Sequence, residues 1–193
     1  MNALPGYSAF TRREFIIAAA AVAGAPVMLR ARDALAATAA TAAADVLIAE
    51  FSDAGVKIGV TRVAKVVKSD AEWRKQLSPL AFSVTRKSDT EFAFSGAFWN
   101  LHEHGIFRCI CCDTALFTSK NKFDSGTGWP SFWLPIAPEN VGGRNGTKAG
   151  PTNTEVTCQR CDAHLGDLFD DGPRPTGLRY CIDSVALRFV KAV

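Results

Sequence analysis

The chain has 193 residues, 48% hydrophobic and 21% charged, which suits one globular domain with a sizeable core. Lys and Arg number 22 against 19 Asp and Glu, a formal net charge of +3, but residues 1–36 hold four arginines, one glutamate and one aspartate. The remainder therefore has 18 basic and 17 acidic side chains, a balance that leaves no basic stripe and argues against nucleic acid as a partner.

Residues 1–36 are predicted to be an export signal. Arg12 and Arg13 form a twin-arginine pattern, and the apolar run 18–29 that follows is short for a bilayer span. Residues 34–36 read Ala-Leu-Ala, a small-x-small cleavage site. We therefore expect cleavage after this site, a periplasmic location in a bacterium and no stable membrane anchor afterwards. The alternative is an uncleaved N-terminal anchor.

Residues 37–69 are predicted to be a flexible lead-in followed by a hairpin. Apolar-rich runs at 46–51 and 56–60 flank the turn residues Ser-Asp-Ala-Gly at 52–55. The sequence leaves open whether this hairpin packs on the rest of the chain.

From residue 70 onward the pattern indicates a mainly β domain with one or two short helices. Residues 69–72 form a capping box, which opens a short helix that Pro79 ends. A strand is expected at 82–85 and a tight turn at 92–96. Beyond them, glycine and proline punctuate short strands, which favours an antiparallel β-sandwich or an open barrel.

Two Cys-x-x-Cys steps predict a metal site. Cys109 pairs with Cys112, and Cys158 pairs with Cys161. A two-residue gap lets one tight turn direct both thiolates at one ion, so two such turns give a four-sulfur zinc site. Four thiolates leave no position for water, so we expect one structural zinc per chain. Disulfides are the alternative in an oxidising compartment, although twin-arginine export of a folded protein would allow metal loading first.

Cys181 is the candidate nucleophile. It lies at the head of an alternating strand, two residues after Arg179 and two before Asp183. A neighbouring cation stabilises a thiolate, so Arg179 is expected to lower the pKa of Cys181. The alternative is a buried structural cysteine.

Five motifs occur in an order that resembles the B-type methionine-(R)-sulfoxide reductases, over roughly residues 70–193. The motifs lie at 72–74, 94–96, 123–132, 161–173 and 177–181. The resemblance implies two antiparallel β-sheets with a zinc-clamped end. It also implies reduction of the R epimer of methionine sulfoxide, both free and in oxidised proteins.

The chemistry of that reaction assigns roles to the candidate residues. Cys181 would attack the sulfoxide sulfur, and His164 would protonate its oxygen. Trp129 would offer an aromatic face to the S-methyl group, with Phe132 as a second substrate-binding residue. Cys181 would be left as a sulfenic acid, which an external thiol or a thioredoxin-like partner reduces.

Three positions depart from the family pattern. Asp167 stands where a second active-site histidine is usual, and its role as a catalytic residue is open. Asp183 replaces a common asparagine, and its charge is expected to raise the pKa of Cys181. Thr127 stands where a recycling cysteine is often found.

We therefore expect a monomer that is recycled by external thiols. Cys111 is the one cysteine left over, and it lies between two zinc ligands, so we expect no disulfide between it and Cys181. The competing hypothesis is an inactive, zinc-stapled binding module of the same fold.

Overall fold

A computed structural model describes residues 44–143 and 154–192, so the predicted export signal lies outside the described residues. All described residues belong to one compact unit, residues 43–193. Within these ranges, no helix is both long and apolar enough to cross a membrane.

Short antiparallel strands make up most of the fold, as the sequence predicts. The strands are β1 (Asp45–Phe51), β2 (Lys57–Ala64), β3 (Gly105–Cys109), β4 (Ala115–Thr118), β5 (Lys122–Phe123), β6 (Ser131–Phe132), β7 (Val141–Gly143), β8 (Thr154–Cys158), β9 (His164–Phe169), β10 (Arg179–Ile182) and β11 (Leu187–Lys191). They form a six-stranded sheet in the order β5-β6-β10-β9-β8-β7, a three-stranded sheet in the order β11-β3-β4, and the hairpin β1-β2. The domain from residue 70 onward thus has the two expected antiparallel sheets, and the hairpin is a separate third sheet.

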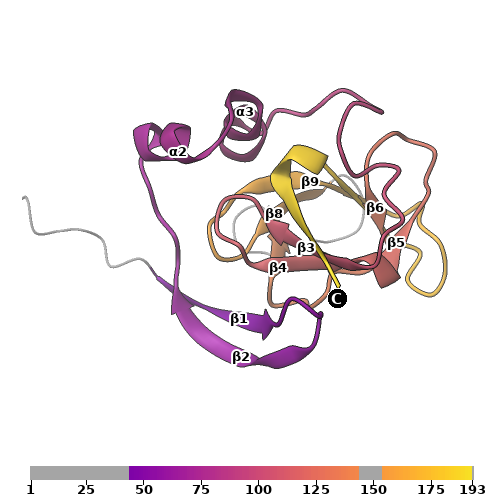
Figure 1. The fold of residues 1–193 in the computed structure, drawn as a ribbon, viewed down its shortest axis with the longest axis horizontal. Helices are drawn as coiled ribbons and strands as arrows, with labels where there is room; N and C mark the ends of the chain where they lie inside the picture. The colour runs from indigo at the N-terminus through magenta and orange to yellow at the C-terminus, as the bar shows by residue number, and fades with distance from the viewer. Residues whose placement is uncertain (1–43, 144–153, 193) are drawn as a thin grey trace, which may run out of the picture. The chain divides into compact units, whose positions relative to one another are not determined.

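The hairpin β1-β2 packs on the rest of the unit, which the sequence left open (Figure 1). Asn140 is fully buried, and its side chain exchanges two 2.8 Å hydrogen bonds with the backbone of Ala49 in β1. The same amide donates to the carbonyl of Ala115 in β4 at 2.7 Å. Asn140 therefore ties the hairpin to the three-stranded sheet through bonds that satisfy buried backbone groups.

Two short helices follow the hairpin, α2 (Asp70–Gln76) and α3 (Pro79–Lys87). The capping box of α2 is present as predicted. The first helix ends before Pro79, as predicted, but the prediction that 82–85 is a strand is wrong, because a second helix covers these residues. Ser78 is the N-cap of α3 and Pro79 occupies its first turn, where a missing N–H costs no helical hydrogen bond.

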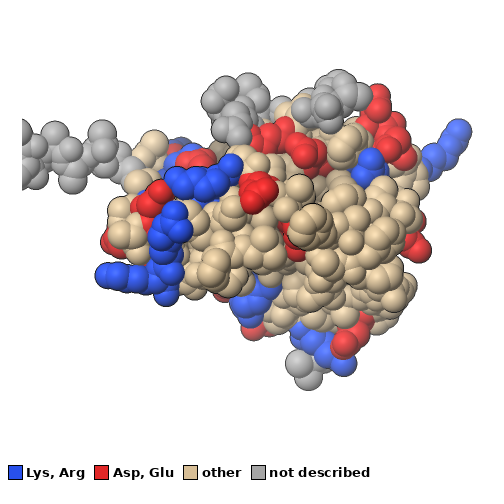
Figure 2. All heavy atoms as spheres, turned by 90° about the horizontal axis from the view of Figure 1, so that it is seen from above, with Lys and Arg blue, Asp and Glu red and all other residues tan. Residues whose placement is uncertain are grey.

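Basic residues occupy the last turn of each helix. They are Arg74 and Lys75 in α2, and Arg86 and Lys87 in α3. Cations at this end interact favourably with the helix dipole. On the face shown in Figure 2, basic and acidic side chains lie among a larger uncharged surface.

Aromatic side chains fill the core. The rings of Phe117 and Phe132 stack with centroids 4.4 Å apart, and Phe107 meets Phe132 edge-on at 5.0 Å. All three are fully buried. Because β4 and β3 belong to one sheet and β6 to the other, these rings join the two sheets.

Candidate active site and metal centre

Four cysteines from two hairpin turns lie together. Cys109 ends β3 and Cys112 follows in the turn to β4, while Cys158 ends β8 and Cys161 follows in the turn to β9. Their four Sγ atoms lie within 4.8 Å of one another. One turn belongs to the three-stranded sheet and the other to the six-stranded sheet. A metal ion bound by all four would therefore clamp the two sheets.

The sulfur spacing suits a tetrahedral ion. The Sγ atoms of Cys109 and Cys161 lie 3.6 Å apart, and those of Cys112 and Cys158 lie 3.5 Å apart. Metal–sulfur bonds of about 2.3 Å give tetrahedron edges of roughly 3.8 Å, whereas a disulfide bond is about 2.05 Å long. The arrangement therefore favours the metal site over the disulfide alternative.

Cys181 lies on β10, which has a neighbour on each side. The register pairs it with Ser131 of β6 and with Asp167 of β9. Directly opposed side chains project from the same face of a sheet, so these three residues share one face. Strand β9 can approach this closely because residue 166 is glycine: a Cβ at Gly166 would lie 2.0 Å from the carbonyl oxygen of Cys181.

The pKa of the Cys181 thiol is raised above its usual value. Burial is the main cause; Arg179 and a hydrogen bond with Thr127 oppose it, and the charge of Asp183 adds to it. Arg179 lowers this pKa and Asp183 raises it, as the sequence predicts, but burial outweighs Arg179, so the net shift is upward. Arg179 is shared with Asp171, whose carboxylate accepts two 2.8 Å hydrogen bonds from the guanidinium.

His164 lies between two carboxylates. Its Nδ1 is 2.8 Å from Oε1 of Glu155, and its Nε2 is 3.9 Å from Oδ2 of Asp183. Burial raises the pKa of Asp183 to about 6, although hydrogen bonds from the Glu91 backbone and the Thr90 hydroxyl oppose the shift. Asp183 can therefore hold a proton close to neutral pH, next to His164 and two residues from the thiol.

The segment before the Phe-Ser-Gly motif at 94–96 forms hydrogen bonds with several residues of this site. The buried carboxylate of Glu91 accepts hydrogen bonds from the backbone N–H groups of Ser184 and Val185 at 2.5 and 3.0 Å. Its backbone N–H donates to Asp183 at 3.0 Å, and its carbonyl accepts from Nε1 of Trp129 at 3.2 Å. Glu91 thus positions both the acid and the indole.

The two predicted substrate-binding residues have different environments. Trp129 is half-buried in the loop before β6. The prediction that Phe132 contacts the substrate is wrong, because its ring lies in the core. The register explains this: Phe132 pairs with Tyr180 while Ser131 pairs with Cys181, and successive side chains of a strand project from opposite faces.

Sequence reasoning missed several residues that contact the site, among them Thr90, Glu91, Asp171 and Glu155. Only Asp171 lies within one of the motifs, at 161–173. Thr90 and Glu91 lie four and three residues before the start of the Phe-Ser-Gly motif, which is a weak signal. Nothing in the local pattern around Glu155 distinguishes it from a solvated strand residue.

Asp183→Asn is expected to stabilise the protein at pH 8 by up to about 3 kcal/mol, the free energy that corresponds to a carboxyl pKa raised from 3.8 to about 6. A raised folded pKa means that the charged form is penalised, so the wild type loses stability as pH rises from about 4 to 6. The amide oxygen can still accept from Thr90 and Glu91. Urea unfolding at pH 4.5 and pH 8 measures the effect, with the exposed Asp170→Asn as control. A difference that does not grow with pH would contradict a buried, raised carboxyl.

Comparison of the sequence with known proteins places the chain in a family. The family described as SelR domain matches residues 77–191. The chain is 55% identical over 125 residues to the peptide methionine sulfoxide reductase MsrB of Herminiimonas arsenicoxydans, covering 65% of this chain and 91% of that protein. It is 52% identical over 124 residues to the MsrB of Thioalkalivibrio sulfidiphilus, covering 64% and 90% of the two chains. The chain belongs to the SelR domain family, and both of these relatives are peptide methionine sulfoxide reductases.

Proposed function

We propose that this protein reduces methionine-(R)-sulfoxide, free and in oxidised proteins, with Cys181 as the nucleophile. The observation that carries the proposal is the position of the Cys181 thiol. It shares a sheet face with Asp167 and lies two residues from the buried acid Asp183. Its strand β10 also pairs with β6, the strand that follows the loop carrying Trp129. The high identity to MsrB proteins supports the same activity.

The reaction balances with one thiol. Cys181 attacks the sulfoxide sulfur, the sulfur–oxygen bond breaks, and the oxygen ends on Cys181 as a sulfenic acid while methionine leaves. The sulfur of the substrate gains two electrons and Cys181 loses two. No net proton is consumed, because the thiol proton ends on the sulfenic hydroxyl. His164 and Asp183 would carry it to the departing oxygen.

We assign zinc to the four-cysteine site, with one ion per chain. The four thiolates and their spacing suit Zn²⁺, which prefers four sulfur ligands in structural sites. When bound, the ion supplies structural cross-linking rather than catalysis, because no coordination position remains for substrate. Cys109, Cys112, Cys158 and Cys161 would hold it.

External thiols are proposed to recycle Cys181. Thr127, which lowers the pKa of the Cys181 thiol, carries a hydroxyl and cannot form a disulfide. Cys111 is buried, and its carbonyl accepts a 2.7 Å hydrogen bond from Gln76, which holds that part of the turn in place. A first external thiol would form a mixed disulfide with release of water, and a second would free Cys181. A thioredoxin-like protein suits this role.

A single-turnover assay with each sulfoxide epimer and no recycling thiol tests the proposal. We expect one methionine per chain from the R epimer only, loss of one free thiol with the metal retained, and a dimedone adduct on Cys181. Turnover of neither epimer would favour the inactive binding module. Loss of two thiols, with a peptide linking Cys111 to Cys181, would contradict the recycling route.

We also propose that the protein is exported through the twin-arginine pathway and works as a monomer in a bacterial periplasm. The paired arginines, the apolar run and the Ala-Leu-Ala step at 34–36 support export. N-terminal sequencing of protein from the periplasmic fraction is expected to begin at Ala37. An intact N-terminus in the membrane fraction would favour the anchor instead.

A further inference from the structure

A row of side chains crosses the six-stranded sheet beside the nucleophile. Cys181 of β10 pairs with Asp167 of β9, and Asp167 pairs with Glu155 of β8. Directly opposed residues project from the same face. Glu155 is therefore on the face of the sheet that carries the thiol, two strands away.

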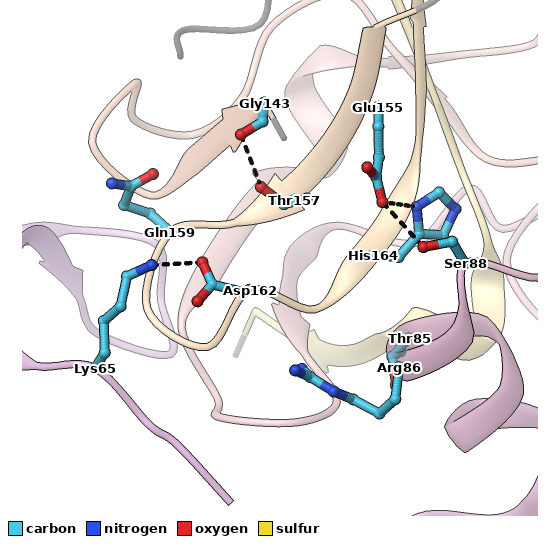
Figure 3. A pocket seen from close by; sticks show the side chains of 10 residues that line it. All are labelled: Lys65, Thr85, Arg86, Ser88, Gly143, Glu155, Thr157, Gln159, Asp162 and His164. Atoms are coloured by element: carbon cyan, nitrogen blue, oxygen red, sulfur yellow. Dashed lines mark hydrogen bonds and ion pairs between the residues drawn. The ribbon is translucent and has the colours of Figure 1, made fainter. Parts of the chain in front are cut away.

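The carboxylate of Glu155 is directed at His164 rather than at solvent. Figure 3 shows the two side chains pointing toward each other, with Ser88 beside them. Oε1 of Glu155 lies 2.8 Å from Nδ1 of His164 and accepts from the Ser88 hydroxyl at 3.2 Å. The side chains of His164 and Glu155 are only 9% and 13% exposed. A hydrogen bond to a carboxylate in such a place is strong and orients its partner well.

The opposite edge of the imidazole faces the catalytic side. Nε2 of His164 is 3.9 Å from Oδ2 of Asp183, a distance that a small movement or one water closes. A carboxylate at Nδ1 keeps the proton of a neutral imidazole on that nitrogen. Nε2 is then the nitrogen without a proton, ready to accept one and to give it back.

We infer that Glu155 is a positioning residue, which fixes the ring orientation and the tautomer of His164 so that Nε2 serves the proton transfers of sulfoxide reduction. This inference rests on the proposed function for its catalytic consequence. The preference for one tautomer does not depend on that function.

Other charged groups surround the histidine and bear on any pH-dependent measurement. His164 and Glu155 line a pocket of about 530 Å³ together with Arg86 of α3, Lys65 and Asp162. Lys65 is paired with Asp162 at 2.5 Å, and Arg86 donates to the Cys161 carbonyl at 2.8 Å. Both cations therefore already have partners.

Substitution at position 155 separates the roles of the acceptor and of its charge. Glu155→Met removes the acceptor at similar length, and Glu155→Ala removes it a second way should the first variant fold poorly. Glu155→Gln keeps an oxygen that can accept from Nδ1. Thr157→Val is the matched control, because Thr157 lies on the same strand and lines the same pocket.

Two readouts are expected to agree. In ¹⁵N spectra of the resting protein, neutral His164 carries its proton on Nδ1 in the wild type, Glu155→Gln and Thr157→Val, and becomes a tautomer mixture in Glu155→Met. In steady-state assays with the R epimer, kcat of Glu155→Met falls by at least ~10-fold with little change in KM, as is typical when the partner that orients a functional histidine is lost. Glu155→Gln is expected to recover most of the loss.

A double-mutant cycle with His164→Ala decides whether Glu155 acts through the histidine. In the His164→Ala background, Glu155→Met is expected to lower kcat no further. An equal loss in both backgrounds, or an unchanged tautomer in Glu155→Met, would overturn the inference. If the wild type reduces neither epimer, the proposed function fails, while the spectra still decide the positioning role.

Discussion

Cys181→Ser is expected to fold normally and to lose sulfoxide reduction by on the order of 10³-fold or more, in line with removal of other enzymatic nucleophiles. A serine hydroxyl is not ionised at neutral pH and is a poor nucleophile toward sulfur. The smaller oxygen atom fits the half-buried position. The measurement is methionine release from the R epimer with an excess of dithiothreitol.

The matched control for this variant is Cys111→Ser. Cys111 is also a thiol outside the four-sulfur cluster, but it is buried at 4% exposure in the turn after β3. It is expected to keep nearly full activity. Activity above a trace in Cys181→Ser, or an equal loss in Cys111→Ser, would remove Cys181 from the role of nucleophile.

Cys158→Ser is expected to release the metal and to destabilise the fold by several kcal/mol. Metal binding is coupled to folding, so removing one ligand removes part of the folding free energy. Domains of this kind have a total stability of about 5–15 kcal/mol. Cys158 is fully buried at the end of β8. We expect a metal content near zero and a large fall in Tm.

Metal analysis and thermal unfolding check this result, again with Cys111→Ser as the control that leaves the four ligands intact. Activity is expected to fall as well, because the metal site is close in the chain to the active site. Cys161, which belongs to the same cluster as Cys158, lies three residues before His164, the first residue of β9, and β9 also carries Asp167. A wild-type protein from the exported fraction that contains disulfides and no zinc would contradict the metal site. So would a Cys158→Ser variant with unchanged metal content and Tm.

Several features could be read from the sequence because their causes are local. The capping box at Ser69 and Glu72 acts over three residues, and the turn at 52–55 joins strands that are adjacent in the chain. Each Cys-x-x-Cys step likewise sets the direction of two sulfurs within one tight turn. Short-range rules of this kind hold wherever the segment lies in the fold.

Other local signals were ambiguous. The apolar residues at 82–85 suit either a strand or one face of a helix, and periodicity over so short a run does not decide. Pro79 is compatible with the end of one helix and with the first turn of the next. Packing decided in favour of a helix over 82–85, because α3 buries Phe82, Val84 and Thr85.

The environment of the site depended on tertiary structure alone. Glu91 reaches Ser184 across 93 positions, and the order β10-β9-β8 brings Glu155 into the same row as Cys181. The burial that raises the pKa of Cys181 is likewise a property of the packed sheet. The sequence by itself determined which residues can act as nucleophile, acid and metal ligand, since that is a matter of side-chain chemistry and short spacing. Their protonation and orientation were decided by groups distant in the chain, because desolvation and hydrogen bonding depend on the distances that only folding sets.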